Sequence, residues 1–270
     1  MSKIEIKNLH AEYADKDGKF TALRDISFSV NGGEFVSIIG SSGCGKSTLL
    51  GVLQGIIFPS SGSAFIDGQS ITGPGANRAA VFQHYSLFPW MTVRKNIVFG
   101  LKQTKKNLPR SERFAVADVF LKKVGLSGFE HKYPFQLSGG MQQRAAIARA
   151  LAMDTDILLM DEPFGAIDAK NRSKMQDLLL SLWEGDTPSK KKTVVFVTHD
   201  IDEAIFLSDR IIMLTNSPGQ IAAEFDVCFP RPRIHSTIRE TVSYINLRNK
   251  LMTLFYDENT GVAADEEYTI

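Results

Sequence analysis

The chain has 270 residues, of which 43% are hydrophobic and 23% charged, as in an ordinary soluble globular protein with one domain or two intimate ones. Its formal net charge of +1 excludes polyanion binding through bulk electrostatics. No apolar run approaches the roughly 18–20 residues that a membrane span needs, so we expect any membrane role to be peripheral.

The few cysteines and the first residues indicate the compartment. Cys44 and Cys228 are the only cysteines, and Cys44 lies in a glycine-rich turn that a disulfide would distort. Residues 1–6 alternate between polar and apolar side chains at once, which predicts that no signal peptide is present. We therefore expect a reducing, cytoplasmic setting.

In chain order, alternating or apolar runs bounded by turn residues predict the strands and helices. We expect strands at 3–13 (an edge strand), 20–30 and 34–39, a helix beginning at 49, and a hairpin piece at 60–68. A strand at 79–82 and helices at 93–101, 113–124 and 140–152 follow. Strands then return at 156–161 and 194–198, with covering helices at 171–183 and 201–207. Strands near 210–215 and 220–226 precede one final helix from about 234 to 255 and an acidic tail at 257–270.

This order predicts an α/β fold. Strands that are apolar on both faces belong in a mainly parallel sheet covered by helices. The first strands look antiparallel and form a separate N-terminal β-subdomain. The three helices between 84 and about 152 form a helical insertion of about 70 residues.

A glycine-rich turn between a predicted strand and a predicted helix matches the phosphate-binding pattern G-x-x-x-x-G-K-[ST]. Its glycines let successive backbone N–H groups point at a phosphate, and the following helix N-terminus adds more donors. Lys46 supplies a positive charge for the β- and γ-phosphates, and Ser47 offers a hydroxyl to Mg²⁺. The alternative is a chance glycine-rich turn, which the flanking strand and helix make the weaker interpretation. The expected ATP-binding residues of this turn are Gly40, Ser41, Ser42, Gly43, Cys44, Gly45, Lys46, Ser47 and Thr48.

Polar groups also follow the ends of three other predicted strands. Asp161 is expected to hold Mg²⁺, and Glu162, one residue further, to polarise the attacking water. His199 would contact the γ-phosphate, and Gln83 could reach both Mg²⁺ and the water. The alternatives are that the Asp-Glu pair only marks a helix N-terminus and that the histidine is structural.

The run Leu137 to Arg144 predicts a second anion-binding helix start. Ser138 is a candidate N-cap, and the glycines after it leave backbone N–H groups bare. The chain thus has two predicted phosphate-binding segments, but only the first carries a lysine, and this suggests a head-to-tail dimer. In such a dimer Ser138 and Gly140 of one subunit close over the nucleotide that Lys46 of the other holds.

With these motifs the chain, over residues 3–226, resembles an ATP-binding cassette (ABC) ATPase. LSGGMQQR at 137–144 is specific to that family among P-loop proteins. The resemblance implies a P-loop NTPase fold, ATP and Mg²⁺ as ligands, and signature residues that act in trans: Leu137, Ser138, Gly139, Gly140 and Gln142. Asp168 would belong to the D-loop, although Gly165-Ala166 stands where the family more often has Ser-Ala. Tyr13 lies where members stack an aromatic ring on adenine, the alternative being an exposed aromatic at a strand end.

The resemblance also implies a domain layout. Residues 1–230 would form the ABC ATPase domain, with a helical subdomain at about 84–152 inserted in a RecA-like core. Residues 231–270 would form a C-terminal helix and acidic tail.

Aromatic residues after Gln83 indicate a partner surface. Phe88 and Trp90 could line a docking groove for a permease helix, or could simply pack the helical subdomain. Pro-Trp-Met-Thr-Val at 89–93 and Pro-Arg-Pro-Arg at 230–233 are similar to the ATPases of nitrate, sulfonate and taurine importers.

That similarity implies the ATPase subunit of a bacterial importer. It would be a peripheral homodimer on the cytoplasmic face of the inner membrane, beneath separate permease chains and indirectly served by a solute-binding protein. Alternatives are an ABC subunit for another substrate class, an inactive regulatory cassette, and a soluble ABC ATPase acting on nucleic acid or ribosomes. The last kind usually carries a coiled-coil insertion or a second cassette, neither of which we find here, so we expect no nucleic-acid partner.

Overall fold

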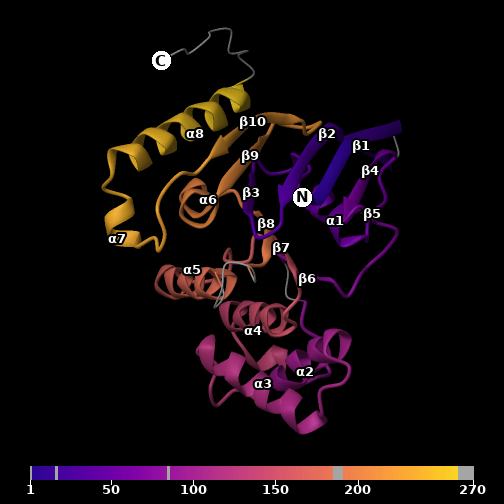
Figure 1. The fold of residues 1–270 in the computed structure, drawn as a ribbon, viewed down its shortest axis with the longest axis vertical. Helices are drawn as coiled ribbons and strands as arrows, with labels where there is room; N and C mark the ends of the chain where they lie inside the picture. The colour runs from indigo at the N-terminus through magenta and orange to yellow at the C-terminus, as the bar shows by residue number, and fades with distance from the viewer. Residues whose placement is uncertain (1, 16–17, 84–85, 185–190, 261–270) are drawn as a thin grey trace.

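The computed structural model describes residues 2–15, 18–83, 86–184 and 191–260 (Figure 1). Its centre is a six-stranded sheet in the order β10-β9-β3-β8-β7-β6. The strands are β3 (Phe35–Ile39), β6 (Arg78–Val81), β7 (Ile157–Asp161), β8 (Thr193–Val197), β9 (Arg210–Leu214) and β10 (Ile221–Asp226). All neighbours pair in parallel except β10, which is antiparallel to β9. Every residue of β3 and β8 is buried, which confirms the predicted helix-covered parallel sheet.

A second, antiparallel sheet confirms the N-terminal β-subdomain. Its order is β2-β1-β4-β5, from β1 (Ser2–Asp15), β2 (Gly18–Asn31), β4 (Ser61–Ile66) and β5 (Gln69–Ser70). The prediction of an edge strand at 3–13 is wrong, because β1 pairs with β2 on one side and with β4 on the other. Alternation of side chains shows that one face is buried, but it does not identify the neighbouring strands.

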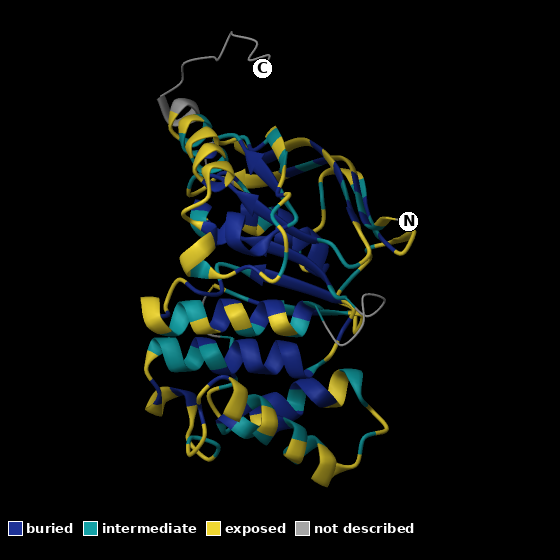
Figure 2. Cartoon of the chain, turned by 60° about the vertical axis from the view of Figure 1, so that its left-hand side comes forward, coloured by how far each residue is buried: buried dark blue, intermediate teal, exposed yellow. Residues whose placement is uncertain are grey.

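Helices cover both faces of the central sheet. They are α1 (Lys46–Gln54), α2 (Val93–Thr104), α3 (Arg110–Lys123), α4 (Gly139–Ala152), α5 (Ala169–Glu184), α6 (Ile201–Leu207), α7 (His235–Ile238) and α8 (Val242–Thr260). Val36 and Ile38 of β3 pack in a core with α1 and the antiparallel sheet, whereas Phe35 and Ile39 pack in a core with α2 to α6. Alternate side chains of a strand point to opposite faces, so α1 and α4 cover opposite sides of the sheet. Strands β3, β7, β8 and β9 are almost wholly buried, as the dark blue centre of the molecule in Figure 2 shows.

The helical insertion lies at one end of the molecule and α8 at the other (Figure 1). Helices α2, α3 and α4 pack on one another, and α4 also contacts β6. The domain boundaries near residues 84, 152 and 230 stay predictions.

The single final helix was a wrong prediction. The segment forms two helices, because Thr241 starts a new one. The Thr241 hydroxyl accepts a hydrogen bond from the Tyr244 N–H at 3.3 Å, as the N-cap residue of a helix does. Helix α8 then runs on to Thr260, so the first residues of the expected acidic tail are helical, and residues 261–270 lie outside the described part. Within that part, no helix is both long and apolar enough to cross a membrane.

Candidate active site

Four parallel strands, β3, β8, β7 and β6, end at one edge of the sheet. The β-ladder places Ile38 of β3 and Asp161 of β7 level with Val197 of β8. The segments that follow these strands carry the phosphate loop, Glu162, His199 and Gln83. Since ligands bind α/β sheets at the carboxyl ends of the strands, this edge is the candidate site.

The phosphate loop leads from β3 into α1. Gly43 and Gly45 have φ values of 82° and 97°, which favour glycine. Gly45 is the N-cap of α1, and no side chain caps the N–H groups of the first turn. A Cβ added at Gly43 would meet nothing within 4 Å, whereas one at Gly45 would lie 2.5 Å from Leu23 Cδ2. The loop is thus packed on β2 at Gly45 and open at Gly43, an anion cradle that fits a phosphate.

Lys46 is held at the base of this cradle. Its side chain is buried, and Nζ donates to the carbonyl oxygens of Gly40 at 2.8 Å and Ser41 at 2.7 Å. Cys44 beside it is a free, buried thiol, and burial raises its pKa, so the thiol is neutral. The lysine therefore supplies the positive charge of the loop.

Tyr13 lies beside the first turn of α1. Its hydroxyl is 3.1 Å from Thr48 Oγ1, and its side chain is partly exposed. This contact brings an accessible aromatic ring next to the phosphate loop, where stacking on a nucleotide base is sterically open.

The three residues expected to act on water meet at Glu162. One carboxylate oxygen, Oε1, lies 3.0 Å from His199 Nδ1, and the other accepts a hydrogen bond from Gln83 Nε2 at 3.2 Å. The His199 ring is largely exposed and Glu162 mostly buried. A carboxylate held between an amide and an imidazole can accept a proton from water.

The backbone of Glu162 is unusual. Its φ is 42°, in the left-handed region that a residue with a side chain rarely adopts. Its N–H donates to the Val197 carbonyl at 2.9 Å, so strand β8 holds this conformation. The turn directs the side chain out of strand β7 and toward His199.

The expected metal ligands are a hydroxyl, a carboxylate and an amide. Mg²⁺ prefers such oxygen donors, and in nucleotide sites it takes one or two carboxylates together with phosphate oxygens. Asp161 ends β7 and is partly exposed, and Ser47 is exposed on the first turn of α1. Together with Gln83 they form a donor set that fits Mg²⁺.

The signature residues start α4 on the other side of the sheet. Ser138 is the N-cap, and its hydroxyl accepts from the Met141 N–H at 3.4 Å. Gln142 Nε2 donates to the Leu137 carbonyl at 3.2 Å. A Cβ added at Gly140 would lie 3.0 Å from the Ala166 carbonyl oxygen, so a side chain there would crowd the D-loop.

Asp168 ends the D-loop and begins α5. Its carboxylate accepts from the Asn171 backbone N–H at 3.1 Å and from the Asn171 side chain at 2.7 Å. These hydrogen bonds lower the pKa of Asp168 and keep the carboxylate ionised on the surface. The signature lies against the D-loop through the close approach of Gly140 to Ala166.

Sequence reasoning missed a buried carboxylate behind His199. Glu203 accepts hydrogen bonds from Thr198 Oγ1 at 3.0 Å and from Gln176 Nε2 at 3.2 Å, and it lines a cavity of about 90 Å³ together with Glu162 and His199. Burial, followed by the charge of Asp200, raises its pKa to about 7. The pattern Asp-x-x-Glu at 200–203 is typical of a helix start, so the sequence alone did not indicate that Glu203 lies buried next to the candidate site.

The two predicted docking aromatics differ in burial. Phe88 packs against Phe99 with ring centroids 4.7 Å apart, as the alternative interpretation expects, whereas Trp90 is 68% exposed. Hydrogen bonds from the Val93 and Arg94 N–H groups to residues 132 and 130 join this segment to the one before the signature.

That neighbouring segment carries two further exposed rings, Tyr133 and Phe135. They stack on each other with centroids 5.7 Å apart, and Phe135 is 75% exposed. Their sequence, Tyr-Pro-Phe, is a signal that we overlooked.

Comparisons with known proteins agree with this geometry. Residues 23–165 match the family described as ABC transporter. An uncharacterized ABC transporter ATP-binding protein of Methanocaldococcus jannaschii is 45% identical over 95% of this chain and 92% of its own length. The nitrate import ATP-binding protein NrtD of Synechococcus elongatus is 46% identical over 88% and 86%. The bicarbonate transport ATP-binding protein CmpC of that organism is 45% identical over 92% of this chain and 37% of its own. Among solved structures, the dimeric cassette MJ0796 in a post-hydrolysis state bound to ADP and Pi is 33% identical with a TM-score of 0.76, covering 84% of this chain and 100% of that one.

Proposed function

Because the chain belongs to the ABC transporter family of ATP-hydrolysing cassettes, we propose that it powers the import of a small oxyanion through separate permease chains. Relatives at 45–46% identity that are named for nitrate import and bicarbonate transport carry this proposal. Nitrate, bicarbonate and the sulfonates suggested by the sequence share the chemistry of a small oxygen-rich anion. The contacts of Glu162 with Gln83 and His199 support an active, rather than a regulatory, cassette.

In this proposal each group of the site has one task. The loop N–H groups and Lys46 would bind the β- and γ-phosphates, and Ser47, Asp161 and Gln83 would hold Mg²⁺, which would neutralise phosphate charge. Glu162 takes the proton of the attacking water. His199 orients the γ-phosphate from the other side of Glu162.

A second copy of the chain completes the site. Helices α1 and α4 begin on opposite faces of the sheet, so the phosphate loop and the signature of one subunit serve two different nucleotides. We propose that Ser138 and Gly140 of one copy close over the nucleotide that Lys46 of the other holds. Dimeric cassette structures among its neighbours support a homodimer. ATP drives closure only because it binds the closed pair better than the open one.

The permease would dock on the exposed rings of the helical insertion. Trp90, Tyr133 and Phe135 are exposed and lie on adjacent segments, and exposed aromatics are typical anchors of protein interfaces. Gln83 starts the segment that leads to Trp90, so ligand contacts at Gln83 could reach the permease. The chain would then be peripheral on the cytoplasmic face, with a solute-binding protein on the other side and no nucleic-acid partner.

Reconstitution tests this function. The chain and its co-purifying permease, placed in proteoliposomes with ATP, should take up one labelled anion among nitrate, bicarbonate and taurine, and the Glu162→Gln variant should not. In cell fractions the chain should sediment with membranes and leave them on alkaline washing. ATPase activity that responds to DNA or ribosomes, with no membrane association, would refute the proposal.

A further inference from the structure

Helix α6 connects the candidate active site to the C-terminal part of the chain. It begins two residues after His199, with Asp200 as its N-cap, and has only seven residues. A short helix moves as a unit, so any contact that fixes α6 also fixes the segment that carries His199. What holds α6 therefore matters for the site.

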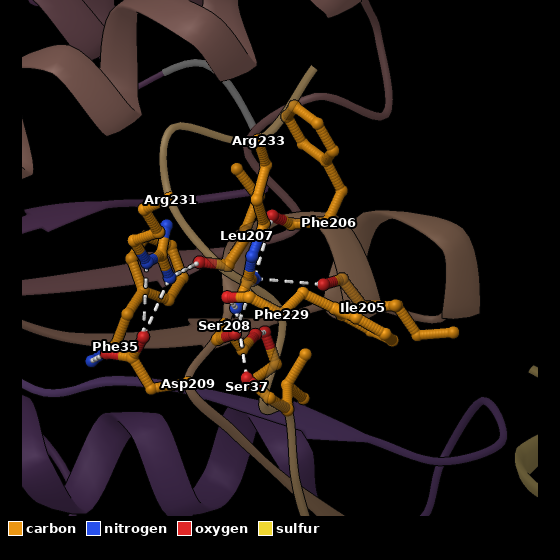
Figure 3. A network of polar contacts seen from close by, with 11 residues as sticks. Phe35, Ser37, Ile205, Phe206, Leu207, Ser208, Asp209, Phe229, Arg231 and Arg233 are labelled. Carbon is orange, nitrogen blue, oxygen red and sulfur yellow. Dashed lines mark hydrogen bonds and ion pairs between the residues drawn. The ribbon is translucent and has the colours of Figure 1, made fainter. Parts of the chain in front are cut away.

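Two arginines hold the C-terminal end of α6 (Figure 3). Arg233 Nη1 donates to the carbonyl oxygens of Ile205 and Phe206, both at 3.0 Å, and of Ser208 at 2.7 Å. Arg231 Nη2 donates to the Leu207 carbonyl at 2.8 Å. The last carbonyls of a helix have no partner within it and form the negative end of its dipole. Here cations from a later segment satisfy all four.

The arginines are themselves fixed. Arg233 is 6% exposed, and burial, followed by the charge of Arg231, lowers its pKa to about 10, so it stays positive at neutral pH. Arg231 Nη2 lies 2.8 Å from Asp209 Oδ1, and its guanidinium lies 4.3 Å from the ring centre of Trp183. These contacts fix the segment that carries Arg231 and Arg233 against the C-terminal end of α6.

The first turn of α6 is held from α8. Asp202 Oδ1 accepts hydrogen bonds from the Tyr244 hydroxyl and from Arg248 Nε, both at 2.8 Å. At the C-terminal end of α6, the ring of Phe206 also stacks on His235 of α7 at 3.6 Å between centroids. Residues 231–248 therefore hold α6 at both of its ends.

We propose that residues 231–248 form a C-terminal clamp whose contacts with α6 set the position of His199, so that Arg233 and Tyr244 are positioning residues for ATP hydrolysis. The inference rests on the proposed role of His199. A segment that only covered apolar surface would need no charged contacts, whereas the clamp directs four cationic or hydroxyl-bearing side chains to a single helix. Arg231 and Arg233 donate to its C-terminal carbonyls, and Tyr244 and Arg248 donate to the carboxylate of Asp202 in its first turn. Hydrolysis then depends on residues that lie outside the nucleotide site.

The test uses mild changes on α8, since removal of the buried Arg233 could unfold the chain. The double variant Tyr244→Phe/Arg248→Gln removes both hydrogen bonds to Asp202. Tyr256→Phe removes the same hydroxyl from an exposed tyrosine of the same helix and is the matched control. Each full-length protein is assayed for kcat and KM of ATP hydrolysis, and for the ring signals of His199 by NMR after ¹⁵N-histidine labelling.

We expect kcat of the double variant to fall about fivefold with KM within twofold of the wild type. The ring signals of His199 should shift while those of His10 and His131 stay in place. The control should match the wild type in all respects. A wild-type kcat, or a reduced kcat with unmoved His199 signals, overturns the clamp.

His199→Ala, measured in parallel, separates the two proposals. If this variant is inactive while the double variant behaves as wild type, the clamp fails and the proposed function stands. If His199→Ala hydrolyses ATP normally, the role given to His199 is wrong and the clamp falls with it.

Discussion

The buried carboxyl of Glu203 should make the stability of the protein depend on pH. Its pKa rises from 4.5 to about 7, first because the group is buried and then because Asp200 is negatively charged nearby. Arg172 and Thr198 favour the ionised form, but Arg172 Nε is 3.8 Å away from Oε1 and does not offset burial. A rise of this size in the pKa means that the ionised carboxylate lowers the free energy of unfolding by about 3 kcal/mol.

The sign follows from which state binds the proton more tightly. The pKa is higher in the folded state, so the stabilising contribution of Glu203 is fully present below pH 4.5 and is lost as the pH rises through about 7. In Glu203→Gln a neutral amide of the same shape replaces the carboxyl and does not titrate. Between pH 5 and pH 8 the variant should therefore gain up to about 3 kcal/mol over the wild type, or roughly 6 °C in Tm.

Thermal unfolding of both proteins at pH 5, 6, 7 and 8 measures this. The informative quantity is how the Tm difference between wild type and Glu203→Gln changes with pH. The other titratable groups are the same in the two proteins, so their contributions cancel in that difference. Glu240→Gln, at an exposed glutamate, controls for the loss of one carboxyl. Parallel Tm curves for wild type and Glu203→Gln would refute the reasoning from burial.

Three further substitutions test the nucleotide site and the proposed docking surface. Lys46→Ala should weaken ATP binding at least about 100-fold, because a buried cation that contacts two phosphates is lost; isothermal titration that finds wild-type affinity would contradict the phosphate-loop assignment. Glu162→Gln should bind ATP but hydrolyse it about 10²- to 10⁴-fold more slowly and trap a dimer on gel filtration, and near-normal turnover would remove Glu162 from its role. Trp90→Ala should weaken permease association about 30-fold and lower transport while ATP affinity is kept, and unchanged uptake in proteoliposomes would favour a packing role.

The nucleotide edge of the sheet could be predicted because its signals are local. The phosphate loop is one run of nine residues between a strand and a helix, and Asp161 and His199 each follow an apolar strand directly. Parallel strands then bring these ends together without further information, since their carboxyl ends share one edge. The contacts of Glu162 with Gln83 and His199 follow from that rule.

The features that the sequence did not predict depend on partners far along the chain. The central place of β1 depends on β4, whose Ile66 pairs with Ile4. The clamp likewise pairs Arg233 with carbonyls 25 to 28 residues away. The Pro-Arg-Pro-Arg run was visible, but alternation and helical spacing describe only local structure and cannot identify which helix end an arginine will meet.

At Glu162 the local rule that glycine occupies positions with positive φ fails, and the reason is functional. A left-handed backbone at a glutamate costs on the order of 1 kcal/mol or more, and glycine would adopt it without that cost. The hydrogen bond from its N–H to Val197 holds this backbone whatever the side chain is. The residue type at this position is therefore explained by what the carboxylate contacts, namely Gln83 and His199, rather than by the turn. Because the glutamine substitution keeps the backbone cost and the shape, any loss of hydrolysis in that variant reports on the carboxylate alone.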